Sequence, residues 1–184
     1  MIETVEGKIV AAIKGTGNIV QATVDTVTEI LATTIKDVGK VGTSVTDVIA
    51  NVVGGAIRGA VQIGADLAHA AKGLMLGVLR GSTEAGMAVL DTIRHTAHVA
   101  IRDTAEVGGD VGAAATGLVA GAIAGAKELG VSAEDAAAAA ADGALKAAGE
   151  VGATAVGAVR KAVTKPIDGV KVVFKEPEMA VSNN

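Results

Sequence analysis

The stretch 117–130, GLVAGAIAGAKELG, places three glycines four residues apart in an apolar run. Residues four apart share one face of a helix, so Gly117, Gly121 and Gly125 would let a second helix approach closely. The apolar window 111–126 has 16 residues, whereas a helix that crosses a bilayer needs about 20. The stretch therefore indicates a close helix–helix contact more than a membrane span. A glycine-zipper oligomer inserted into a membrane stays an alternative.

The composition around this stretch disfavours an ordinary compact core. The chain has 184 residues, of which 50% are hydrophobic, yet it contains one Phe, no Trp or Tyr, and 25 glycines. A fully buried large apolar side chain contributes about 1.5–3 kcal/mol, and Ala and Gly contribute far less. We therefore expect an all-α protein whose long helices touch closely or lie against another surface.

Charge and residue usage exclude several classes of function. The net charge of -4 comes from 16 basic and 20 acidic residues without a basic block. The chain also lacks the aromatic side chains on which the bases of a nucleic acid could stack. Nucleic acid is therefore not an expected partner. The chain has no cysteine and no nucleophile elbow or complete phosphate loop, so we expect no catalysis and no cofactor. The start, MIETVEGKIVAAIKG, does not look like a secretion signal, which favours a cytoplasmic location.

The three histidines offer a weak candidate for a metal site. His95 and His98 are three residues apart, and Asp91 lies one turn before His95. This spacing could hold a metal. Solvated histidines on a polar helix face are the more frequent explanation, so we expect no metal site.

An eleven-residue period runs through residues 20–126. Eleven residues make three helical turns at 3.67 residues per turn, so each register keeps to one side of a nearly straight helix. One register gives a narrow stripe of mixed charge, and others give a wide apolar face. The polar stripe contains Lys36, Asp47, Arg58, Arg80, Asp91 and Arg102. The apolar face, which would contact lipid or another helix, contains Val41, Val45, Val52, Ile63, Leu67, Leu74, Val78, Val89 and Leu118.

The period and the break signals predict four segments. Residues 1–14 form a short amphipathic helix that ends at GTGN, and residues 18–129 form one long helix kinked at the glycine pairs 54–55 and 108–109. Gly130 suits a helix C-cap, and Ser132 with Asp135 resembles a capping box. An Ala-rich helix over 132–165 then folds back as a hairpin and ends before Pro166. Residues 166–184 form an extended or disordered tail.

The long helix is not expected to be stable alone, because each interior glycine costs about 1 kcal/mol relative to Ala. Its apolar face must be covered. Because its charged stripe is nearly neutral, its binding to a membrane would depend little on the charge of the lipids. We therefore expect a protein that coats or remodels a lipid, membrane or storage-granule surface as a peripheral protein. The alternative is a structural protein that self-assembles through Ala/Gly faces into bundles, filaments or shells. A homo-oligomer is expected in either case.

The repeat units GNIVQATVDTVTEILATTIKDVGKVGTSV and GAIRGAVQIGADLAHAAKGLMLGV resemble the eleven-residue-repeat amphipathic helices of perilipins and synucleins. The shared features are Gly-Ala-Val-Thr units, one or two charges per repeat and almost no aromatic residues, although the KTKEGV core of synucleins is absent. Bacterial phasins are a looser analogy. The resemblance covers residues 14–126 and implies reversible coating of lipid droplets, vesicles or granules.

Overall fold

The computed structural model describes residues 2–41 and 44–173, and this part of the chain is all-α, as predicted. It contains eight α-helices and one short 3-10 turn, Thr83–Ala85, between the fourth and fifth helices. The helices are α1 (Ile2–Thr16), α2 (Ile19–Val41), α3 (Val45–Gln62), α4 (Leu67–Gly81), α5 (Val89–Glu106), α6 (Val111–Leu129), α7 (Ala133–Val151) and α8 (Ala153–Thr164).

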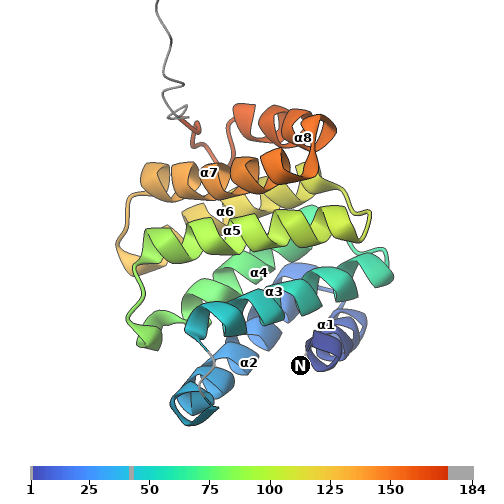
Figure 1. The fold of residues 1–184 in the computed structure, drawn as a ribbon, viewed down its shortest axis with the longest axis vertical. Coiled ribbons are helices and arrows are strands. Elements are labelled where there is room, and N and C mark those ends of the chain that lie inside the picture. The colour runs from blue at the N-terminus through green and yellow to red at the C-terminus, as the bar shows by residue number, and fades with distance from the viewer. Residues whose placement is uncertain (1, 42–43, 174–184) are drawn as a thin grey trace, which may run out of the picture.

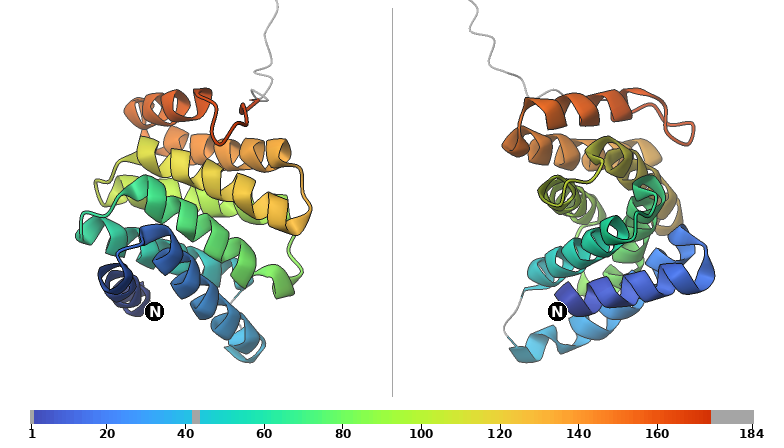
Figure 2. Two further views of the ribbon diagram at one scale, coloured as in Figure 1. Left: turned by 180° about the vertical axis from the view of Figure 1, so that it is seen from behind. Right: turned by 90° about the vertical axis from the view of Figure 1, so that its right-hand side faces the viewer.

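The helices stack in two layers (Figures 1 and 2). One layer holds α1, α3, α5 and α7, and the other holds α2, α4, α6 and α8, so each helix packs on the helix two places further along the chain. This is the architecture of an α-solenoid, in which each repeat contacts its neighbours and buries one continuous core.

The stack has a period of 22 residues. Helices α3 to α7 begin at residues 45, 67, 89, 111 and 133, each 22 after the last. The turns between them contain Gly64, Gly86, Gly108 and Gly130, whose φ angles lie between +64° and +74°. A left-handed residue ends a helix, and glycine adopts this conformation without a steric penalty. The same glycine at the same place in each turn therefore sets the length of every repeat.

The region 18–129 is divided into the five helices α2 to α6, so the prediction of one long kinked helix is corrected. The eleven-residue period is half of the 22-residue unit. Steps of eleven residues from a turn glycine therefore alternate between a turn and the buried middle of a helix. The buried positions are Val53, Met75, Ala97 and Val119, all 0% exposed. The pair 54–55 lies within α3, whereas 108–109 follows α5.

Side-chain caps start most of the repeats. Ser44, Asp66, Asp110 and Ser132 each accept a hydrogen bond from the backbone N–H three residues later, at 3.0–3.3 Å. Such caps satisfy amide groups that a helix leaves unpaired. The exception is Ala88, which precedes α5 and has no side-chain cap.

The C-terminal part differs from the expected hairpin in its details. The Ala-rich segment consists of two helices, α7 and α8, divided at Gly152. Helix α7 contacts α6 across the turn at Gly130 and packs more extensively on α5.

The first part of the expected tail is also folded. Ile167 and Val170 exchange two backbone hydrogen bonds of 2.9 Å around a turn with positive φ at Asp168 and Gly169, as in a type I′ turn. Residues 174–184 lie outside the described part of the chain.

The core is a thin band between the layers. Its largest fully buried side chains include Ile9, Leu31, Ile49, Ile57, Leu74, Met75, Ile93, Ile101, Leu118 and Ile123. The buried residues of helix α7 are all Ala or Gly, such as Ala140 and Ala144, and its Leu145 packs against the core from the edge. Within the described residues, no helix is both long and apolar enough to cross a membrane.

Candidate functional site

The glycine stripe of α6 lies against α4 within the same chain. A side-chain Cβ at Gly121 would lie 2.6 Å from the carbonyl oxygen of Lys72 and 2.7 Å from the Cβ of Met75. A Cβ at Gly117 would meet the carbonyl oxygen of Ala68 in the same way. These glycines therefore allow the two helix backbones to approach more closely than any side chain would permit.

A second stripe, on α4, repeats this arrangement 44 residues earlier. Gly73, Gly77 and Gly81 stand in register with Gly117, Gly121 and Gly125, and they face α2. A Cβ at Gly77 would lie 2.7 Å from the Cβ of Val27. The corresponding positions of α2 carry Glu29, Thr33 and Asp37, so the close-packing series ends there. A polar outer face is typical of the terminal helix of a solenoid.

The expected apolar face is covered by the chain's own helices. Most of its members pack into the core or along its edge, and only Val151 and Val173 are large exposed hydrophobic residues in the described part. The fully buried members are Val52, Leu74, Val78 and Leu118, and Leu67 is 8% exposed. The half-buried members are Val45, Ile63 and Val89, and the side chain of Val41 lies outside the described residues.

The polar stripe is exposed, and its members have two different roles. Asp47 and Asp91 lie in the first turns of α3 and α5, where the helix dipole favours a negative charge. The arginines lie further along their helices, and two of them bridge helices within a layer. Arg58 of α3 pairs with Glu106 of α5 at 3.8 Å, and Arg80 pairs with Glu128 in a bidentate contact of 2.6 and 2.9 Å. Both pairs join positions 48 residues apart.

The remaining stripe residues do not bridge helices in this way. Lys36 is exposed on α2, and Arg102 contacts its neighbour Asp103 on α5. The charge alternates along the sequence because the acidic residues lie at the starts of helices and the arginines lie later in them. It does not reflect one continuous helix that faces lipid.

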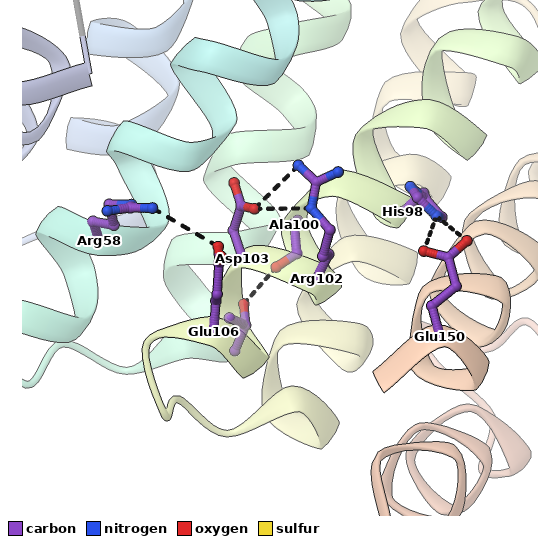
Figure 3. Close-up of polar contacts among 8 residues, drawn as sticks. Arg58, His98, Ala100, Arg102, Asp103, Glu106 and Glu150 are labelled. Carbon is purple, nitrogen blue, oxygen red and sulfur yellow. Dashed lines mark hydrogen bonds and ion pairs between the residues drawn. The ribbon is translucent and has the colours of Figure 1, made fainter. Parts of the chain in front are cut away.

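Six side chains form a polar surface of three separate pairs across α3, α5 and α7 (Figure 3). We call this surface the polar ladder, and its members are Arg58, His98, Arg102, Asp103, Glu106 and Glu150. At the α7 end, His98 Nε2 lies 3.1 Å from both carboxylate oxygens of Glu150. This hydrogen bond lowers the pKa of Glu150. The ladder therefore carries both signs of charge and links three helices of one layer.

Asp103 is the buried member of the polar ladder. It is 6% exposed, and Arg102 Nε and Nη2 both lie 3.3 Å from its Oδ1. Burial raises the pKa of Asp103, although the nearby positive charges of Arg102 and Arg58 oppose this effect. On the facing helix, a Cβ at Gly54 would lie 2.7 Å from Asp103 Oδ2.

The sequence analysis did not identify Asp103, although the repeat contains a signal for it. Steps of 22 residues relate position 103 to Gly59, Gly81, Gly125 and Ala147. The same register contains Asp37 on α2, the first helix of its layer, so Asp103 is the carboxylate that occupies this position on a helix packed against an earlier helix of its layer. The eleven-residue period obscured this difference, because it merges helix interiors with turns.

The histidines and Asp91 do not converge on one point. His95 Nε2 lies 3.3 Å from the carbonyl oxygen of Thr46, His98 contacts Glu150, and Asp91 pairs with Arg94. Across residues 2–41 and 44–173, no group of three or more His, Cys, Asp or Glu side chains could hold a metal ion.

No protein-family model and no curated protein matches this chain. Each position can still be compared with its equivalents in the chain's own repeats.

Proposed function

We propose that this protein is a non-catalytic structural scaffold, a stack of helices that folds through its own Ala/Gly faces and presents its charged surface to protein partners. The observation that carries the proposal is that the glycine stripes of α4 and α6 are both occupied by helices of the same chain. The apolar face is covered without lipid, because Leu74, Val78 and Leu118 are at most 1% exposed.

The exposed surface suits a protein partner. Solenoids present extended surfaces because their repeats are stacked in one direction, and the polar ladder spans three helices in that direction. It contains Arg58 and Arg102 beside Glu106 and Glu150. Such a mixture of charges gives specificity through complementary pairing. It offers no uniformly basic track for a nucleic acid.

A second candidate is a peripheral coat on a lipid, membrane or granule surface. It is favoured by the way the helices are joined: α3, α4, α5 and α7 each have a buried and an exposed face, α6 is buried along most of its length, and the turns between them each contain one left-handed glycine. Rotation at those glycines would unstack the layers and turn the Val, Ala and Leu face towards an apolar surface. Unstacking would expose the close contacts of α4 with α2 and α6, so this function requires an interface that binds the opened form more tightly than the folded form.

Circular dichroism with sedimentation separates the two candidates. The full chain is measured in buffer, then with neutral and with anionic phospholipid vesicles. A scaffold is strongly helical in buffer, unfolds cooperatively on heating and neither changes nor floats with vesicles. Weak helicity in buffer that rises sharply on both vesicles would overturn the scaffold and support the coat.

A pair of variants sharpens the comparison. Leu74→Asp places a charge in the core of α4 and should unfold the scaffold in buffer, since Leu74 is 1% exposed. Val151→Asp changes an apolar residue that is already 46% exposed and should leave the fold intact. If Leu74→Asp stays folded in buffer and loses only vesicle binding, the scaffold proposal fails.

A further inference from the structure

We propose that the contact between α3 and α5 is a pH-sensitive seam, which tightens when Asp103 is protonated and loosens when Asp103 is ionised. This inference concerns regulation of the stack and does not depend on which partner the surface binds.

The first observation is the position of the carboxyl group. Asp103 is 6% exposed and faces the backbone of α3 at Gly54, where a Cβ would lie 2.7 Å from Oδ2. An alanine at position 54 would therefore collide with the carboxylate. The missing side chain on α3 makes room for the carboxyl group on α5.

The second observation is that the charge is incompletely compensated. The side-chain partner of Asp103 is its neighbour Arg102, whose two nitrogens lie 3.3 Å away and whose side chain is 49% exposed. From α3, Arg58 acts on the carboxylate but pairs with Glu106, and Glu106 itself repels Asp103.

The other helices against α5 add little compensation. From α7, Glu150 is paired with His98, and the charges that act most strongly on Asp103 are those of Arg102, Glu106 and Arg58, which lie on α5 and α3. Burial therefore outweighs the two arginines, and the carboxyl group binds its proton more tightly than an exposed one.

The third observation is the comparison among repeats. The equivalent positions Gly59, Gly81 and Gly125 each lie close to the preceding helix of their layer, and Ala147 is fully buried. At these positions, a small residue permits a tight contact that does not depend on pH. Among the described contacts between neighbouring helices of one layer, α3–α5 alone has a titratable group in that place, because Asp37 of the same register lies on α2, the first helix of its layer.

The direction of the effect follows from proton linkage. The pKa of Asp103 is higher in the folded chain than its ordinary value of 3.8, so the folded state binds more protons than the unfolded state between those two values. Stability therefore rises as the pH falls through the folded-state pKa towards 3.8, and it falls as the pH rises. Glu128 and Glu150 have lowered pKa values, so their contributions have the opposite sign and act at lower pH.

The test uses urea denaturation of the full chain between pH 7.5 and 3.8, which covers the range in which Asp103 takes up its proton. Within the window of Asp103, each pH unit should change the unfolding constant of the wild type by up to about tenfold. Asp103→Asn keeps the shape of the side chain without the charge. It should be more stable than the wild type at pH 7.5 and should lack the rise on acidification. Asp91→Asn, an exposed control on the same helix, should keep the wild-type rise. Equal pH profiles for the wild type and Asp103→Asn would overturn the proposal.

A distance measurement locates the effect at the seam. Because the chain has no cysteine, spin labels can be placed on cysteines at Gln62 of α3 and Lys146 of α7, which are exposed and lie on opposite sides of the seam. The distance distribution should narrow on acidification in the wild type and be narrow at both pH values in Asp103→Asn. A control pair at Asp91 and Lys146 lies on one side of the seam and should not respond.

Two further outcomes are decisive. A stability change without a change in the distance between Gln62 and Lys146 would overturn the assignment to the seam. If Asp103→Asn fails to fold, Asp103→Ser provides a smaller uncharged side chain for the same comparison. A pH profile of Asp103→Ser that matches the wild type would overturn the proposal, and a flat profile would support it.

Discussion

Replacing Gly121 by alanine tests whether α6 is held against α4 by backbone contact. The added Cβ would lie 2.6 Å from the carbonyl oxygen of Lys72 and 2.7 Å from the Cβ of Met75, whereas carbon atoms in ordinary contact are about 3.5–4.0 Å apart. Neither neighbour is the flexible end of a side chain, so α6 must move away by about 1 Å. Overpacking of this kind typically costs about 1–3 kcal/mol.

Gly157 provides the matched control. It lies within α8, and nothing lies within 4 Å of the position that its Cβ would take. Both substitutions gain up to about 1 kcal/mol of helix propensity, because alanine restricts the unfolded chain more than glycine does. The stability difference between Gly121→Ala and Gly157→Ala therefore isolates the contact with α4, and we expect it to be about 1–3 kcal/mol.

Thermal unfolding followed by circular dichroism measures this difference. For a chain of this size, 1 kcal/mol shifts the Tm by about 2–4 °C. We expect Gly157→Ala to melt at or above the wild-type temperature and Gly121→Ala to melt at least about 2 °C below Gly157→Ala. Equal melting temperatures of the two variants would refute the close packing of α6 on α4.

Three further predictions test the turns, the caps and the core by equilibrium denaturation. Gly108 has a φ of +74°, so Gly108→Ala should lose about 1–2 kcal/mol although no atom obstructs the new side chain; no loss would contradict the role of the turn glycines. Ala88→Asp should add the missing cap of α5 and gain about 1 kcal/mol, and a loss would show that residue 88 does not occupy the cap position. Leu74→Ala should lose about 2–5 kcal/mol because Leu74 is 1% exposed. Arg80→Ala should lose less than about 1 kcal/mol, because its ion pair with Glu128 is 43% exposed on both sides, and the reverse order of these two losses would place Leu74 on the surface.

The charge stripe shows how a real sequence period led to the wrong prediction of one long helix over residues 18–129. Asp47, Arg58, Arg80 and Asp91 do recur in one register. Eleven residues are close to three helical turns, so the register is compatible with one straight helix. The structure shows that Asp47 and Asp91 lie in the first turns of their helices and Arg80 in the last turn of α4, where the helix dipole favours each sign, whereas Arg58 lies before the last turn of α3.

Of the four turn glycines, only Gly130 was predicted to end a helix, although all four lie in one register. Gly64, Gly86, Gly108 and Gly130 are separated by 22 residues. The residue two places after three of these glycines has a side-chain oxygen that caps the next helix, as at Asp66 and Asp110. Step sizes of 22 residues distinguish these glycines from the buried residues halfway between them. A step of eleven residues cannot make that distinction.

The polar ladder could be predicted only in part. The exposure of Arg58 and Arg102 follows from their charge, because water solvates an ion better than a protein interior does. Their partners could not be predicted, since the pairing of Arg58 with Glu106 depends on α3 lying beside α5. Steps of 22 residues mark position 103 as one where Gly59, Gly81 and Gly125 are small, but the burial of Asp103 against Gly54 depends on α3 lying beside α5.

The sequence by itself determined the helical class, the break at Gly130, the cap at Ser132 and the weakness of any single helix. These properties depend on backbone propensity and on contacts within a few residues. Only the tertiary structure decided what covers the apolar faces. A face of Ala, Val and Gly can pack equally on lipid, on another copy or on the same chain, because burial of apolar area is not directional. The geometry at Gly117 and Gly121 selects the chain's own α4, since backbone atoms brought this close leave room for no other partner.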